Sequence, residues 1–405
     1  MPLNFNHLRK FLILAGIILF ANFTICISQP ELPKSVANIG ELETYIKKLT
    51  DYGIPQGISM VVVKDTQIVY SKGFGWADRP KQISAAPESV YHWFSITKVV
   101  TALCILQLEE RGKLKIEDKV TKYLPFFEVK YPSDTSRQIT ILNLLNHSSG
   151  IKDATIDLIR WVHHYGESPV NQTDMIKKAL PKYSKLIYEP GTQNKYTNVG
   201  YMVLAAIIEK VSGQSYDEYV RQNVLIPLGM NHTDFLYTKT MGKNEAAGAH
   251  HRFDMISVFI KIRLRSYVAK TYKSHIWFKR FYNDQEAPSG LIGPVTDLAL
   301  LTEAYINKGE LNGKRILSEE SIGKMTNSGF IMNPGDDPNS FVKKGIAWMV
   351  DRKPDGIKLS HTGAGLGFTT ALQLFPEKKI GIAVFSNDTK CKPWQIADLA
   401  STLEW

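Results

Sequence analysis

A serine and a lysine stand three residues apart at the start of a long apolar stretch. The stretch "SITKVVTALCILQLEERGKL" opens with Ser95 and Lys98, and its pattern predicts a helix that ends at Gly112. Residues three apart on a helix share a face, so the Lys98 ammonium can approach the Ser95 hydroxyl. A serine hydroxyl needs such a neighbour to act as a nucleophile. The helix N-terminus beside it would favour a developing oxyanion.

The spacing alone is weak evidence, because it recurs at Ser321/Lys324 and at Ser340/Lys343. Ser340 lies in a loop rich in Gly, Pro and Asp, and Ser321 lies in a polar surface helix. Only Ser95 opens an apolar helix, where a lysine is costly unless another group pairs with it.

Two further motifs carry polar groups at the ends of predicted elements. Tyr196 and Asn198 stand where a loop enters a second apolar helix, "NVGYMVLAAIIEKVSG". His361-Thr-Gly363 ends a predicted strand, and a glycine-rich turn follows it. Glycines at such a place let the backbone approach a ligand closely.

In this order, Ser95-Ile-Thr-Lys98, Tyr196-Thr-Asn198 and His361-Thr-Gly363 resemble the three motifs of the penicillin-recognising serine hydrolases. That superfamily includes class C β-lactamases, D-alanyl-D-alanine carboxypeptidases, D-aminopeptidases and related esterases. The resemblance extends over roughly residues 35–400, through segments such as "ITILNLLNHSSGI" and "VLIPLGMNHTDF". It implies a β-lactamase/transpeptidase-like fold and hydrolysis of a small-molecule or peptide substrate through an acyl-enzyme, without metal or organic cofactor.

The resemblance also implies a role for each matching residue. Ser95 is the expected nucleophile, Lys98 and Tyr196 share proton transfer, and Asn198 holds the Lys98 ammonium or a substrate amide. Which of Lys98 and Tyr196 is the base stays open. The strand side of the cleft and the oxyanion hole are expected to comprise His361, Thr362, Gly363 and Ala364, with the N–H groups of Ser95 and Ala364 as donors.

One departure from the family pattern bears on the substrate. Class C β-lactamases usually carry lysine at the position of His361, whereas some D,D-carboxypeptidases and D-aminopeptidases carry His-Thr-Gly. A histidine is mostly neutral near pH 7 and anchors a carboxylate less firmly than lysine. We therefore expect an amide or ester substrate with a D-amino acid or similar small acyl group. The alternatives are a β-lactamase, a short-chain carboxylesterase, and a penicillin-binding or scaffold protein without turnover.

The elements that must position these residues come from distant parts of the chain. "GISMVVVKDTQIVYSKGFGW" predicts an early hairpin, and further short strands are predicted between residues 345 and 387. Mainly helical patterns lie between the two sets, and a last helix is predicted at residues 392–405. This arrangement predicts an α+β fold with an antiparallel sheet from the N- and C-terminal segments, flanked by helices, and an inserted helical lobe.

Residues 1–28 differ from the remainder of the chain. A basic start at Arg9 and Lys10, an apolar run and an exit at Ser28 predict a signal peptide, with an uncleaved membrane anchor as the alternative. Either way residues 29–405, the expected hydrolase domain, would be extracytoplasmic, periplasmic or secreted. With 44% hydrophobic and 22% charged residues the chain is typical of a globular protein.

Cysteine and histidine usage argues against other kinds of site. Cys104 and Cys391, which remain after signal removal, provide no disulfide framework, and Cys104 is expected in the core. The pairs His163/His164 and His250/His251 lack a carboxylate at ligand spacing, so no metal site is expected. Oligomeric state stays open.

A basic, aromatic insertion covers residues 254–284. No acidic residue lies between Asp254 and Asp284, although seven basic ones do. In "VFIKIRLRSYV" apolar and basic residues alternate, which predicts a half-buried strand. The insertion could contact a membrane surface or an anionic cell-wall polymer. Solvated charge is the favoured interpretation, because charge runs usually face water; no recognition motif supports nucleic acid.

Overall fold

A computed structural model describes residues 30–153, 161–167, 169–242, 244–333, 341–354 and 356–405 of the chain. The predicted signal peptide or anchor, residues 1–28, lies outside the described residues. Within the described part, no helix has the length and hydropathy needed to cross a bilayer.

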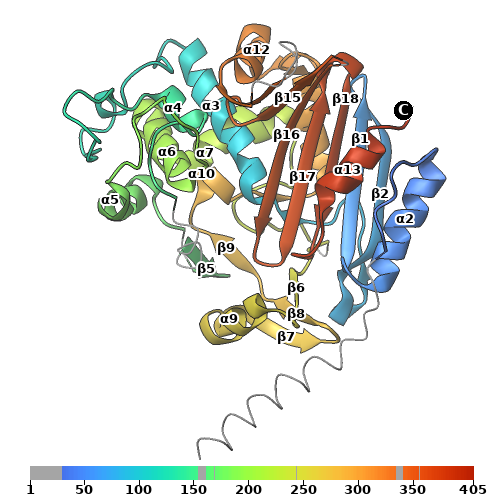
Figure 1. The fold of residues 1–405 in the computed structure, drawn as a ribbon. Helices are drawn as coiled ribbons and strands as arrows, with labels where there is room; N and C mark the ends of the chain where they lie inside the picture. Colours follow the sequence, from blue (N-terminus) through green and yellow to red (C-terminus); the bar gives the residue numbers. More distant parts are fainter. Residues whose placement is uncertain (1–29, 154–160, 168, 243, 334–340, 355) are drawn as a thin grey trace, which may run out of the picture.

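A nine-stranded antiparallel sheet joins the two ends of the described chain (Figure 1). β1 and β2 form the predicted hairpin, and β1 pairs on its other side with β18, so that Ile58 lies opposite Ser386. The α+β prediction, with a sheet from N- and C-terminal segments, is confirmed. In spatial order the strands are β13 (Phe330–Asn333), β14 (Phe341–Lys344), β15 (Met349–Lys353), β16 (Gly356–Gly365), β17 (Phe368–Phe375), β18 (Ile380–Ser386), β1 (Gly57–Lys64), β2 (Gln67–Asp78) and β3 (Ile83–Ser84).

Both faces of the sheet are covered, which explains the unbroken apolar run of β1. Met60 and Val62 pack against one helical layer, made by α2 (Ile39–Tyr52) and α13 (Pro393–Ala400). Val61 and Val63 point to the opposite face and join the main core. Successive residues of a strand alternate between faces, so a strand buried on both sides reads as continuously apolar.

The helical lobe lies on the second face, around α3 (Thr97–Glu110). This helix is buried on nearly all sides and includes Cys104, as predicted. It packs on α6 (Asn198–Ser212), and α11 (Val295–Ile306) lies between the lobe and the sheet. The other helices are α4 (Ile141–Leu145), α5 (Gln172–Tyr183), α7 (Tyr216–Val220), α8 (Ile226–Leu228), α10 (Glu286–Ser289) and α12 (Glu319–Asn327).

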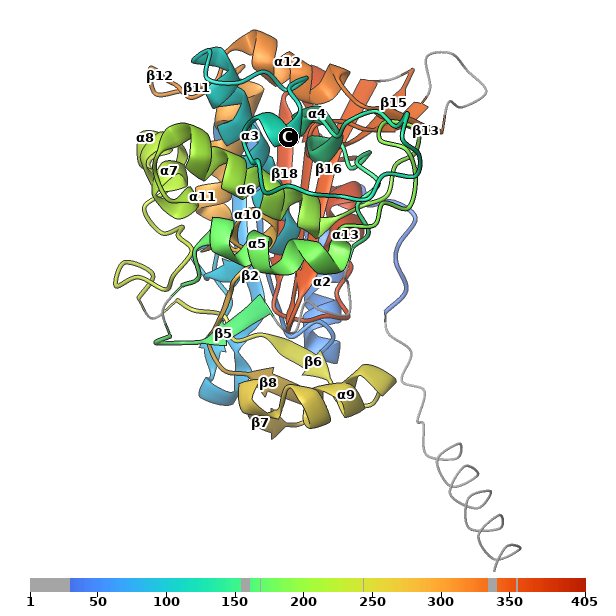
Figure 2. The same ribbon diagram turned by 90° about the vertical axis from the view of Figure 1, so that its left-hand side faces the viewer.

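The insertion forms one end of the molecule in both views (Figures 1 and 2). The strand predicted over "VFIKIRLRSYV" is wrong for most of its length, because Met255–Arg263 is a helix, α9. The Asp254 carboxylate accepts a hydrogen bond from the Ser257 N–H and caps this helix. Two small sheets lie at this end of the molecule: β6 (Ala249–His251), β8 (His275–Phe278) and β7 (Val268–Tyr272) form one, and β5 (Val162–His164) and β9 (Phe281–Asn283) form the other. Two short strand pairs lie elsewhere, β4 (Tyr91–His92) with β10 (Ile292–Gly293) and β11 (Glu310–Leu311) with β12 (Lys314–Arg315).

β16 is longer than its neighbour β15, and the difference exposes one edge. β15 pairs with β16 only as far as Ser360, so the edge from His361 to Gly365 faces the turn η2 (Phe94–Ile96) instead. A Cβ atom at Gly363 would overlap the carbonyl oxygen of Trp93 and the hydroxyl of Thr370. Glycine is therefore required for this close approach.

We predict that Gly363→Ala lowers the free energy of unfolding by about 1–3 kcal/mol, because the added methyl group must displace backbone and side-chain atoms. Gly323→Ala is the matched control, since Gly323 lies within α12 with no close neighbour and alanine favours helix. Urea denaturation followed by tryptophan fluorescence measures both. Equal midpoints for Gly363→Ala and the unaltered chain would contradict the close packing of β16 on η2.

Candidate active site

Ser95 lies in a tightly held turn just before α3. The helix begins at Thr97, two residues later than the sequence predicts, and Ser95 occupies the 3₁₀ turn η2. Phe94 precedes it with a φ of 48°, a left-handed conformation that a bulky residue rarely adopts. The Thr370 hydroxyl donates to the carbonyl oxygen of Trp93 at 2.9 Å and links the turn to β17. Such strain persists only where the surroundings enforce it, and it clusters at functional sites.

Two of the residues predicted from sequence, Tyr196 and Lys98, contact the Ser95 hydroxyl. Tyr196 Oη donates to Ser95 Oγ at 2.8 Å, and Lys98 Nζ lies 3.2 Å from the same oxygen. Asn198 lies one step further away, where its Oδ1 accepts a hydrogen bond from Lys98 Nζ at 2.8 Å. The fold thus brings together residues separated by about a hundred positions in the chain.

The burial of Lys98 is the main electrostatic feature of this site. Its side chain is 0% exposed, and burial lowers the pKa of the amine well below its usual value, with the Asp153 charge opposing the shift. Burial also raises the pKa of the Tyr196 phenol, while the hydrogen bond with Ser95 acts the other way. A neutral amine is therefore easier to form here than a phenolate.

The contacts of Lys98 Nζ suit a base that faces Ser95. Its N–H groups donate to Asn198 Oδ1 and to the carbonyl oxygen of Pro288, each at 2.8 Å. A neutral amine has two N–H groups, so these partners occupy both and leave the lone pair toward Ser95 Oγ. The Tyr196 hydroxyl donates to Ser95, and the Ser95 hydroxyl can then donate to Lys98. This order lets the serine proton move to Lys98.

Sequence reasoning missed two groups that hold this arrangement. Asp153 accepts hydrogen bonds from the Asn198 backbone N–H at 3.1 Å and from its Nδ2 at 3.2 Å. This fixes the Asn198 amide so that its oxygen faces Lys98. The second group is the carbonyl oxygen of Pro288 in α10, which accepts a hydrogen bond from Lys98. Such a contact cannot be predicted from residue type, because every residue has a carbonyl group.

The His147 ring packs against the Tyr196 ring and helps to position it. Its own φ is 62°, it is buried, and its Nδ1 accepts a hydrogen bond from the Thr197 N–H at 3.2 Å. The two rings lie 4.4 Å apart between centroids. Burial, followed by the charge of Lys98, lowers the pKa of His147, so this ring is neutral and supports the site without titrating near pH 7.

The strand motif His361-Thr-Gly363, with Ala364 after it, approaches the turn of Ser95 from the sheet. Only part of this motif lines the cavity that contains Ser95. Ala364 lines the same cavity as Ser95, and Gly363 packs on the turn η2. His361 Nδ1 lies 2.9 Å from the carbonyl oxygen of the exposed Thr362, so His361 does not join the hydrogen bonds around Ser95. Its ring is partly buried, and desolvation together with the charges of Lys98 and Lys344 lowers its pKa. His361 is therefore a neutral side chain near pH 7.

A cavity of about 430 Å³ contains Ser95 and is mostly apolar. Its polar groups include Ser95, Asn198 and Ser289, whereas α9 supplies an apolar wall. That wall includes Ile256, Phe259, Ile260 and, just after the helix, Leu264. Apolar cavities with a few polar groups at one end are typical of small-molecule sites.

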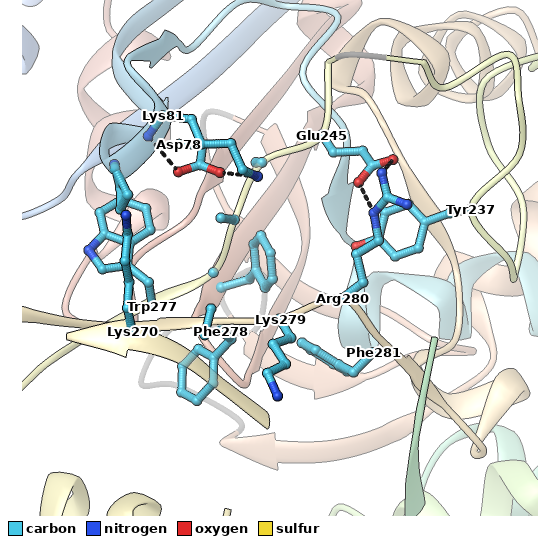
Figure 3. A pocket seen from close by; sticks show the side chains of 16 residues that line it. Asp78, Lys81, Tyr237, Glu245, Lys270, Trp277, Phe278, Lys279, Arg280 and Phe281 are labelled. Carbon is cyan, nitrogen blue, oxygen red and sulfur yellow. Dashed lines mark hydrogen bonds and ion pairs between the residues drawn. The ribbon is translucent and has the colours of Figure 1, made fainter. Parts of the chain in front are cut away.

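A second hollow, of about 200 Å³, lies between the end of β2 and the β7–β8 ribbon and does not include Ser95 (Figure 3). Two charge pairs border it, Lys81 with Asp78 and Arg280 with Glu245. Among the described residues, no three His, Cys, Asp or Glu side chains gather as a metal site.

The fold and these motifs are those of the penicillin-recognising serine hydrolase superfamily. The chain matches the Beta-lactamase family over residues 42–400 and belongs to it. Protein flp of Staphylococcus aureus (strain COL) is 33% identical over 209 residues, which cover 51% of this chain and 40% of flp. The match therefore spans less than half of that relative.

Solved structures share the fold. The octameric penicillin-binding protein homologue from Pyrococcus abyssi has a TM-score of 0.72 at 29% identity, over 90% of this chain and 77% of that one. D-amino acid amidase from Ochrobactrum anthropi SV3, complexed with L-phenylalanine, has a TM-score of 0.69 at 17% identity, over 89% of this chain and 98% of that one. Similarity at that identity concerns the fold.

We predict that the rate at which a fluorophosphonate labels Ser95 rises with pH as Lys98 loses its proton, and that Asp153→Asn moves this rise to lower pH. The Asp153 carboxylate stabilises the ammonium, so neutralising it lowers the pKa of Lys98 further. Mass spectrometry of the adduct across a pH series measures the midpoint. Lys98→Met should remove the pH-dependent rise.

The control for charge alone is Asp134→Asn, because Asp134 is exposed and belongs to another loop. A midpoint that stays unchanged in Asp153→Asn, or a rise that survives in Lys98→Met, would show that another group takes the Ser95 proton.

Proposed function

We propose that this protein is an extracytoplasmic serine hydrolase that cleaves amides or esters of small acyl groups, such as D-amino acid amides and peptides, through an acyl-enzyme on Ser95. The observation that carries the proposal is the position of Ser95 Oγ between Tyr196 Oη, at 2.8 Å, and Lys98 Nζ, at 3.2 Å. Membership of the Beta-lactamase family supports hydrolysis by this serine. The shared fold of a D-amino acid amidase is compatible with this substrate class.

In the acylation step Ser95 Oγ attacks the carbonyl carbon and its proton passes to Lys98 Nζ. The carbonyl oxygen becomes an oxyanion, which the N–H groups of Ser95 and Ala364 would hold. Collapse of the tetrahedral intermediate breaks the bond to the leaving group, and the proton returns from Lys98 through the Tyr196 hydroxyl to the leaving nitrogen or oxygen. Water then attacks the Ser95 ester, with Lys98 and Tyr196 moving protons in the same way.

The surroundings of Ser95 favour a substrate without a terminal carboxylate. His361, where related lactamases carry lysine, is neutral and forms its polar contact within its own strand. The cavity beyond Ser95 is lined by apolar groups, including Phe278 and Leu366. Amidase or D-aminopeptidase activity is thus favoured over carboxypeptidase activity. The apolar wall also favours a short-chain carboxylesterase as the second candidate.

We predict that Ser95→Ala lowers hydrolysis on the order of 10⁴-fold or more, because no nucleophile remains. The panel contains a D-amino acid amide, a D-Ala-D-Ala peptide, p-nitrophenyl butyrate and a chromogenic cephalosporin, each measured as initial rates. The substrate hydrolysed most efficiently identifies the activity. Ser340→Ala is the control, since it removes the same serine–lysine spacing elsewhere in the chain.

Two results would contradict the proposal. Hydrolysis unaffected by Ser95→Ala would remove Ser95 as the nucleophile. A folded protein without activity, and without a covalent adduct from penicillin or a fluorophosphonate, would indicate a scaffold.

A further inference from the structure

Exposed apolar side chains are concentrated on α9 and at Phe253, two residues before this helix begins. Of the sixteen large hydrophobic residues that are exposed in the described part of the chain, six lie within residues 253–262. Their exposed fractions reach 86% at Met255 and 71% at Ile262. We name this set the α9 face; its members are Phe253, Met255, Ile256, Val258, Phe259 and Ile262.

The inner side of α9 is also apolar, and Lys261 and Arg263 are the exposed polar side chains of this helix. Ile260 and Leu264 are buried against Ile276 and Phe278 of β8. Met255, Val258 and Ile262 follow the helical spacing of three and four residues along the outer side. The apolar side of a helix is normally buried against a partner. The outer side of α9 therefore lacks a partner among the described residues.

Basic side chains lie on α9 and on the adjoining β7–β8 ribbon. Lys261, Arg263 and Arg265 are exposed on α9 or just after it. Lys270, Lys273 and Lys279 are exposed on the adjoining ribbon. No described carboxylate forms an ion pair with any of these six residues. Arg280, by contrast, is paired with Glu245, and Figure 3 shows the Lys279 ammonium pointing away from that pair.

The acidic residue nearest the α9 face has its charge compensated. Asp254 accepts from Lys390 Nζ at 2.7 Å and caps α9, and His250 Nε2 lies 2.9 Å from its other oxygen. These contacts also fasten the start of the helix to the body of the protein. The α9 face is thus a fixed apolar surface bordered by uncompensated positive charge.

We propose that the α9 face docks on an anionic lipid bilayer, with the apolar side chains entering the headgroup region and the six basic side chains meeting lipid phosphates. Short amphipathic helices with apolar and basic residues bind in this way. A hydrated anionic polymer would use the charges but leave Met255 and Ile262 in water, so the bilayer fits better. With nine residues, α9 lies on the membrane and is too short to span it.

This docking would place the catalytic cavity at the membrane surface. Ile256 and Phe259 belong to the α9 face and also line the cavity that contains Ser95. They therefore form its rim. The docking itself needs no chemistry at Ser95, so it can be tested separately from the proposed function.

The test places an environment-sensitive fluorophore on α9, in the full chain. Ile262→Cys is labelled with a nitrobenzoxadiazole dye in a Cys26→Ser background, because Cys104 and Cys391 are buried. We expect a blue shift and an intensity rise with vesicles of phosphatidylcholine and phosphatidylglycerol, and little change with phosphatidylcholine alone. The dye reports insertion of α9 itself, even if another segment binds the vesicle. Ile226→Cys, at a residue 64% exposed on α8, is the matched control and should not respond.

Charge variants test the second part of the proposal. Each of Lys261→Gln, Arg263→Gln and Arg265→Gln should weaken the vesicle titration roughly fivefold, from about 1 kcal/mol per basic residue near an anionic surface. The exposed Lys113→Gln, Lys115→Gln and Lys119→Gln should have no such effect. Ser95→Ala should leave the shift unchanged, which separates docking from catalysis.

Several results would overturn the docking proposal. These are an unchanged emission at position 262 with anionic vesicles, an equal response at position 226, or a response that ignores the charge variants. A blue-shifted emission without vesicles that depends on protein concentration would assign the α9 face to contact between copies of the chain. Retention by a soluble polyanion, with no response to vesicles, would assign the basic residues to a polymer.

Discussion

The site depends on a lysine amine that has been removed from water. Burial of an ammonium costs on the order of several kcal/mol unless other groups replace its hydration. Here the Asn198 amide oxygen, the Pro288 carbonyl and Ser95 Oγ replace it, and Asp153 adds a negative charge nearby. The compensation is partial, so the pKa of Lys98 stays low and the amine can accept a proton. A fully paired lysine would stay charged and could not serve as a base.

This compensation requires both parts of the fold. Ser95 and Lys98 come from the start of α3, Asn198 from the start of α6 and the Pro288 carbonyl from α10, all in the helical lobe. The sheet contributes the edge of β16, which presses against the turn that carries Ser95. Ser95 is therefore held between the lobe and the sheet, where contacts from both sides maintain the strained backbone of Phe94.

The insertion at residues 254–284 adds a further element, α9, to this framework of lobe and sheet. The alternating apolar and basic residues of the insertion predict a strand with one face exposed to solvent. The segment is instead a helix, because Asp254 caps its start and the buried residues Ser257, Ile260 and Leu264 follow helical spacing. A period of two and a period near 3.6 are hard to separate over so few residues. The resulting helix forms one wall of the cavity and presents its remaining apolar side chains outward. Local pattern could not reveal this second role, because exposure depends on what packs against the helix.

The sequence was sufficient to predict the residues that chemistry restricts by type and spacing, Ser95 with Lys98 and Tyr196 with Asn198, and also the early hairpin and last strands of an α+β fold. Only after folding is it visible that Asp153 orients Asn198 and that the Pro288 carbonyl oxygen accepts a hydrogen bond from Lys98. The same holds for the contact of His361 with its own strand and for the position of α9 at the cavity. The physical reason is that a backbone carbonyl or an exposed apolar side chain has no signature in the sequence. Its effect arises only from the groups that folding places beside it.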